Sequence, residues 1–170
     1  MLWEPGTGKI IRMDHDRLFK QLLTVFSAEF IELSLPGVAA YVDRESVEFL
    51  DKEVFTDVTS GERHEVDLLA KARFRGRDAF FLIHVEFQSS AGEDFPRRMF
   101  RYFARLFEEL ALPVYPIAVF SYDAPARPEP DRFRVEFPDR MVMDFSFATV
   151  QLNRLDWRDY ARRPNPWPRR

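Results

Sequence analysis

Two strand-like segments joined by a tight turn constrain this chain more than any other feature. Residues 64–74 (HEVDLLAKARF) and 78–88 (DAFFLIHVEFQ) have the residue types and alternation of β-strands. Between them lies RGRD, in which Gly76 supplies the backbone freedom that a tight turn requires. We therefore predict a β-hairpin. Its turn is either Gly76-Arg77 or the symmetric four-residue loop 75–78, and in both cases paired residue numbers sum to 153.

This register places two carboxylates side by side. Glu86 lies opposite Asp67, and because strand side chains alternate, His84 and Gln88 share their face. Directly opposed carboxylates repel each other, so the arrangement suits a hard cation such as Mg²⁺, which takes oxygen ligands and keeps several waters. Such an ion can activate a water for phosphodiester hydrolysis. The amide of Gln88 could orient that water or a phosphate oxygen.

Two other interpretations of the carboxylate pair remain open at this point. Asp67 and Glu86 could lie at a solvated end of the sheet without a ligand. A one-residue bulge would also change the register and separate them. His84 could act as a base, or it could be a half-buried residue with a structural role.

Apolar periodicity and turn residues predict the remaining elements. The predicted helices cover residues 14–35, 95–112 and 154–162. Asp14 or Asp16 caps the start of the first helix, and Pro36-Gly37 stops it. The predicted strands cover residues 47–55, 113–123, 132–137 and 141–152. Up to residue 123 the chain thus runs helix, strand, hairpin, helix, strand. This order predicts an α/β sandwich with a mixed central β-sheet flanked by helices.

Composition limits the classes of function. The 170 residues correspond to one domain, and the absence of cysteine excludes disulfides, thiolate zinc sites and a thiol nucleophile. The net charge of −3 requires any nucleic-acid contact to be a local patch. Arg97, Arg98 and Arg101 on the second predicted helix could form that patch, or they could be a solvated helix face. No secretory signal or membrane-spanning run is apparent, so we expect a cytoplasmic protein without a membrane partner.

Several motifs occur in an order that resembles a known family. HD-x-x-FK is matched by residues 15–20, an acidic helix end running into LP by EFIELSLP, and R-x-x-D-L-L by ERHEVDLL, in which the arginine spacing is longer by one. E-x-Q-S-S is matched by residues 86–90, and the arginine- and tyrosine-containing helix and a late NP stretch follow. Over residues 13–167 the chain resembles the Rpn/YhgA-like family of recombination-promoting nucleases and transposases, within the PD-(D/E)XK nuclease superfamily.

The resemblance implies a restriction-endonuclease-like fold and a Mg²⁺- or Mn²⁺-dependent endonuclease that hydrolyses DNA and is linked to mobile elements or recombination. It implies that Asp67 and Glu86 bind the metal and that Gln88 occupies the usual lysine position, which removes a positive charge. Further site residues could come from the first predicted helix: Asp16, Lys20, Glu29 and Glu32.

Local composition at the two ends, together with the resemblance, suggests how the chain is divided. We expect a loosely ordered N-terminus over 1–12, a nuclease-like domain over 13–160 and a basic tail over 161–170. Family members usually continue further after the NP stretch, so a catalytically inactive short member that binds DNA or a protein is the alternative. Hydrolysis of RNA is also open. A homodimer is expected because two sites related by a two-fold axis suit the cutting of two strands.

Overall fold

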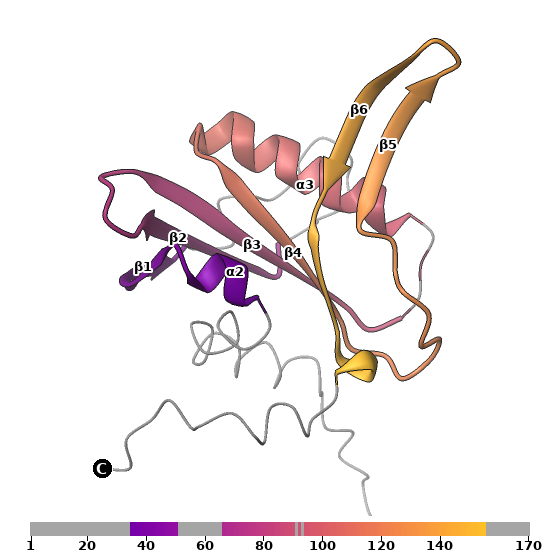
Figure 1. Ribbon diagram of the computed structural model, residues 1–170, viewed down its shortest axis with the longest axis horizontal. Coiled ribbons are helices and arrows are strands. Elements are labelled where there is room, and N and C mark those ends of the chain that lie inside the picture. Colours follow the sequence, from indigo (N-terminus) through magenta and orange to yellow (C-terminus); the bar gives the residue numbers. More distant parts are fainter. Residues whose placement is uncertain (1–34, 51–65, 91, 93, 156–170) are drawn as a thin grey trace, which may run out of the picture.

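The computed structural model describes residues 35–50, 66–90, 92 and 94–155 (Figure 1). Within these ranges the elements, in chain order, are α2 (Pro36–Ala39), β1 (Val42–Phe49), β2 (Leu68–Phe74), β3 (Phe80–Gln88), α3 (Phe95–Leu110), β4 (Val114–Phe120), β5 (Arg132–Phe137), β6 (Arg140–Ser146), β7 (Ala148–Gln151) and the 3₁₀-helix η2 (Leu152–Arg154). The helix predicted over residues 14–35 and the domain limits predicted at residues 12 and 160 lie outside the described residues.

The main sheet is mixed, as predicted. Its strand order is β1-β2-β3-β4-β7, with antiparallel pairing from β1 to β3 and parallel pairing from β3 to β7. Helix α3 connects the parallel neighbours β3 and β4, as a parallel pair requires a crossover. The α/β class with a mixed central sheet is confirmed, and this architecture is compatible with a restriction-endonuclease-like fold.

Strand β3 is buried on both faces because it lies in the middle of the sheet. Phe81, Ile83 and Val85 belong to a core cluster that also contains Val38 of α2. Leu82, one residue along, belongs to the opposite cluster with residues of α3. The apolar run FFLI therefore reflects a strand that is covered from two sides. By the same alternation, the even-numbered positions of β3 lie on the face covered by α3.

Helix α3 covers this second face with one apolar stripe. Its buried residues, Phe95, Met99, Tyr102 and Leu106, recur at helical spacing. The helix ends at Leu110, two residues earlier than predicted, because Ala111 adopts a left-handed conformation with φ 50°. The Ala111 N–H donates to the carbonyl of Phe107 at 3.0 Å, which closes the last turn.

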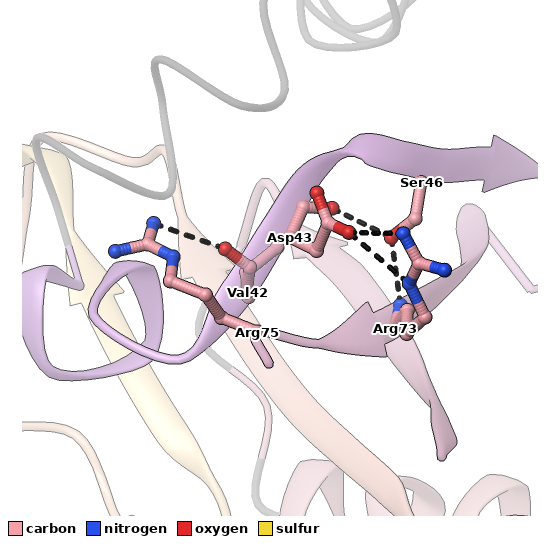
Figure 2. A network of polar contacts seen from close by, with 5 residues as sticks. All are labelled: Val42, Asp43, Ser46, Arg73 and Arg75. Atoms are coloured by element: carbon pink, nitrogen blue, oxygen red, sulfur yellow. Dashed lines mark hydrogen bonds and ion pairs between the residues drawn. The ribbon is translucent and has the colours of Figure 1, made fainter. Parts of the chain in front are cut away.

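The prediction of a strand over residues 47–55 was only partly correct. Strand β1 starts earlier, at Val42, and its register with β2 shifts between Asp43 and Glu48. A polar network spans this irregularity (Figure 2). The Arg73 N–H donates to Oγ of Ser46 at 2.8 Å, and the Arg73 guanidinium donates to the Asp43 carboxylate at 2.6 Å. Such polar residues do not alternate with apolar ones, so the pattern did not indicate the start of this edge strand.

The C-terminal prediction also needs a correction. Residues 141–152 were expected to form one strand, but β6 ends at Ser146 and β7 starts at Ala148. Phe147 lies between them, and its N–H donates to the Asp131 carbonyl at 3.0 Å. Strand β6 pairs with β5 in a separate hairpin, whereas β7 joins the main sheet beside β4 (Figure 1). The chain changes sheets here because Phe145 and Phe147 both pack into the cluster beneath α3.

Two smaller helix predictions also differ from the structure. Pro36 and Gly37 were expected only to end a helix, yet Pro36 begins the short helix α2, where its fixed φ is favourable. Of the helix predicted over residues 154–162, the described part contains the end of η2, and residues beyond 155 lie outside the description.

Candidate active site

The β2–β3 hairpin has the predicted register. Leu68 pairs with Val85 and Arg73 with Phe80, so paired numbers sum to 153 along the whole ladder and no bulge interrupts it. The Phe74 N–H donates to the Ala79 carbonyl at 2.9 Å, which closes the four-residue loop rather than the two-residue turn. Gly76 in this loop has φ +71°, a conformation that glycine adopts without strain.

This register brings Asp67 and Glu86 together just where β2 begins. The Asp67 N–H donates to Oε1 of Glu86 at 3.1 Å, and the Phe87 N–H donates to Oδ2 of Asp67 at 2.8 Å. Each carboxylate is therefore held by a backbone amide of the opposite strand. These donors partly offset the repulsion between the two negative charges and fix both side chains in place.

Glu86 is buried rather than solvated. Its exposed fraction is 3%, and the neighbouring His84 is fully buried. Nε2 of His84 lies 2.9 Å from Oε1 of Glu86, so a ring N–H donated to this oxygen accounts for the contact. The interpretation of a solvated sheet end is therefore wrong for Glu86. A buried carboxylate requires partners, and His84 is one of them.

Tyr102 of α3 covers this pair from the helix side. Its ring meets the His84 ring edge-on, with 5.6 Å between the ring centroids. Burial, and then the nearby charge of Glu86, raises the pKa of Tyr102 to about 12. The hydroxyl consequently keeps its proton at neutral pH. The sequence motifs did not identify Tyr102 as a site residue. The signal that could have found it is its position four residues after Arg98 on a helix that must cover the sheet.

Arg98 of α3 reaches the same end of β3. Its Nη2 donates to Oε1 of Gln88 at 2.6 Å, and its guanidinium lies 5.0 Å from the centre of the Phe95 ring. Gln88 in turn donates from Nε2 to the Ser90 carbonyl. A cation thus stands beside the amide that replaces the lysine expected from the resemblance.

The three arginines predicted as a patch differ in exposure. Arg98 is half-buried and turned toward Gln88, whereas Arg97 and Arg101 lie on the exposed side of α3. The prediction that all three contact nucleic acid remains untested. The four further residues predicted from the first helix, Asp16, Lys20, Glu29 and Glu32, lie outside the described residues.

The donor set at this site fits a hard divalent cation. Across the ranges that the structure describes, no group of three or more His, Asp and Glu side chains is arranged to hold a metal ion. Mg²⁺, however, is commonly bound through one or two carboxylates, with waters completing the shell. Asp67 and Glu86 supply two carboxylates, and each carboxylate oxygen can accept more than one interaction. The residues present therefore suit Mg²⁺ or Mn²⁺ better than a metal that needs nitrogen or sulfur ligands.

The fold and this site define an α/β protein with a mixed sheet and a carboxylate pair, half-buried Asp67 and buried Glu86, at the end of a central strand. Residues 13–119, more than half of the chain, match the family model described as "Putative transposase, YhgA-like", and the chain belongs to this family. Membership associates it with DNA-processing proteins of mobile elements. No curated protein and no solved structure shows significant similarity to the chain. Among the described residues, no helix is long and apolar enough to cross a membrane.

Proposed function

We propose that this protein is a Mg²⁺- or Mn²⁺-dependent endonuclease that hydrolyses phosphodiester bonds in DNA. The observation that carries the proposal is the hairpin register, which brings Asp67 and Glu86 together on the face covered by α3. Membership in a transposase family supports DNA as the substrate. When bound, the metal would supply Lewis-acid activation of the phosphate and of a water.

Asp67 and Glu86 are proposed to hold the metal. Each is fixed by a backbone N–H from the other strand, and His84 holds Oε1 of Glu86 from the interior. Ligands that are held by neighbouring groups need little rearrangement when a cation binds. In this proposal His84 is a positioning residue, not a general base, because its side chain is fully buried and its Nε2 contacts Glu86.

Arg98 is proposed to contribute the positive charge that Gln88 lacks. Gln88 holds one end of its guanidinium and the Phe95 ring lies beneath it. A planar guanidinium can donate two hydrogen bonds to one phosphate group. Held at Gln88, two residues after Glu86 on β3, it would bind the scissile phosphate and stabilise the charge that develops in the transition state.

Nicking of supercoiled plasmid in the presence of Mg²⁺ or Mn²⁺ tests this function. We expect the wild type to nick, and the isosteric variants Asp67→Asn and Glu86→Gln to lose activity by a factor of about 100 or more. Glu109→Gln, a change of the same type at an exposed position of α3, is the matched control and should keep full activity. An RNA substrate of the same length distinguishes the two nucleic acids.

Metal binding is measured separately, by the melting temperature with Mg²⁺, Mn²⁺ or Ca²⁺, because a ligand that binds the folded state stabilises it. We expect a metal-dependent increase in the wild type and none in Asp67→Asn or Glu86→Gln. If the wild type neither nicks plasmid nor gains stability with metal, the nuclease proposal is wrong. The alternative, a catalytically inactive family member that binds DNA or a protein, would then be the better description.

A further inference from the structure

The β5–β6 hairpin extends away from the main sheet and presents an open edge (Figure 1). At its base it is anchored to α3, where the ring centres of Phe133 and Phe100 are 5.6 Å apart. Toward its tip, large apolar side chains are exposed: 55% of Phe137 and 56% of Val142. A two-stranded hairpin is marginal in water without further cover, so this end of the hairpin is suited to a partner.

The two edges of the hairpin differ. Strand β6 carries an extra residue, Val142, because Val135 pairs with Met143 whereas Glu136 pairs with Met141. A bulge of this kind discourages pairing with another strand. Strand β5 has no extra residue, and among the described strands only β6 pairs with it. The outer edge of β5 is therefore the one suited to strand addition.

We propose that the outer edge of β5 pairs with the β5 of a second copy of this chain, antiparallel and centred on Val135. A two-fold axis perpendicular to the hairpin then places Arg134 opposite Glu136 of the second copy, twice by symmetry. The same register places Phe133 opposite Phe137 of the second copy. Opposite charges and aromatic pairs at directly opposed positions both stabilise such a pairing, and the exposed Phe137 rings become covered.

The neighbouring registers are unfavourable, which makes the choice specific. A two-fold axis perpendicular to the sheet leaves each side chain on the same face of the sheet. Each alternative register is therefore centred on a residue, and the two nearest alternatives are centred on the residues next to Val135. Centring on Arg134 would oppose two arginines, and centring on Glu136 would oppose two glutamates. Like charges directly opposite destabilise a strand pair. Of these three registers, only the one centred on Val135 avoids both.

Sedimentation of the full chain over a range of concentrations tests the proposal, with charge changes as the probe. We expect a concentration-dependent dimer in the wild type. Glu136→Arg and Arg134→Glu should each raise the dimer dissociation constant about tenfold or more, since each homodimer then opposes like charges twice. An equimolar mixture of the two variants should form heterodimers again, because both cross-strand pairs become complementary. Glu108→Arg, the same charge reversal on an exposed part of α3, should dimerise like the wild type.

Several outcomes would overturn this pairing: a wild type that stays monomeric, variants that dimerise unchanged, or a mixture that fails to re-form dimers. Arg134 also pairs with Asp144 of its own chain at 3.2 Å, so Arg134→Glu could unfold the hairpin. Circular dichroism identifies that case. The dimer proposal is then tested by the wild type, Glu136→Gln and Glu136→Arg alone. Dimerisation is expected to weaken in that order. The inference does not depend on nuclease activity, which the nicking assay tests separately.

Discussion

At the scale of single residues, the central feature is the buried carboxylate of Glu86, which is held by the Asp67 N–H and by His84. Oε1 of Glu86 receives the Asp67 N–H at 3.1 Å and lies 2.9 Å from Nε2 of His84. Removing one partner of a buried charge leaves the remaining group without compensation, which costs more than the hydrogen bond itself contributes. This physical asymmetry makes His84 a sensitive test of the site.

We expect His84→Leu to lower the free energy of unfolding by about 1–3 kcal/mol, because Oε1 of Glu86 loses one donor in a buried position. In the double variant with Glu86→Gln the loss should be smaller than the sum of the two single losses, by about 1 kcal/mol. Urea unfolding of the four proteins measures this coupling. If the loss of stability in the double variant equals the sum of the two single losses, His84 contributes only packing.

Arg98 provides a second residue-scale prediction. Arg98→Gln should reduce single-turnover nicking about 100-fold while the metal-dependent rise in melting temperature persists, because the cation acts on the phosphate and not on the metal. Arg97→Gln, the neighbouring and exposed arginine, should change the rate only a few-fold, through weaker and salt-dependent attraction to DNA. Comparable losses in the two variants would argue that α3 contributes general positive charge and that Arg98 has no special position.

At the scale of elements, the β2–β3 hairpin and α3 together create the site. The hairpin sets which residues face each other, and α3 covers that face with Tyr102 and Arg98. The register depends on a loop of four residues in which Gly76 has a positive φ. A change in this loop therefore tests how strongly local geometry contributes to the stability of the whole sheet.

Gly76→Ala should lower the free energy of unfolding by about 1–2 kcal/mol. The cause is backbone strain at φ +71°, since no atom lies within 4 Å of an added Cβ. Gly37→Ala in α2 also meets no atom within 4 Å, and it has no positive φ. That control should be neutral or slightly stabilising, because alanine favours a helix over glycine. Urea denaturation of both variants gives the comparison, and an equal loss in both would contradict the argument from strain.

At the scale of the whole molecule, the family match ends before the β5–β6 hairpin begins. The match ends at residue 119, within β4, and so includes the hairpin and α3. The β5–β6 hairpin and β7 follow it. Strand β7 completes the main sheet beside β4, whereas the hairpin stands apart as the proposed contact between two copies. The proposed catalytic and assembly surfaces therefore belong to different parts of the chain.

The dimer predicts that thermal stability depends on protein concentration. The melting temperature of the wild type should rise as the concentration increases from micromolar to higher values, since association stabilises the folded state by mass action. Added salt should reduce this dependence, because the Arg134–Glu136 pairs lie at an exposed edge. Glu136→Arg should show a smaller rise in melting temperature over the same concentration range, because its dimer is weaker. Scanning calorimetry measures the effects of concentration, of salt and of the substitution on the melting temperature. A wild-type melting temperature that does not depend on concentration would contradict the dimer.

The hairpin register and the presence of helix α3 were determined by sequence alone. The register follows from a loop of four residues, and the pairing of Asp67 with Glu86 follows from alternation over short strands. Helix α3 follows from apolar residues at helical spacing, among which Met99 and Leu106 are buried, whereas Phe107, which the same spacing places on the apolar face, is 52% exposed. In both cases the residues that decide the structure lie close together in the chain, so their pattern carries the information.

Only the tertiary structure decided which groups approach the carboxylates and where the chain changes sheets. Arg98 turns toward Gln88 because α3 lies over the end of β3, and Glu86 is buried because His84 and α3 cover it. The break at Phe147 depends on packing of its ring against α3, although the local pattern predicts one continuous strand. These features rest on contacts between residues far apart in sequence. Their free energies depend on burial and geometry that periodicity within one segment does not contain.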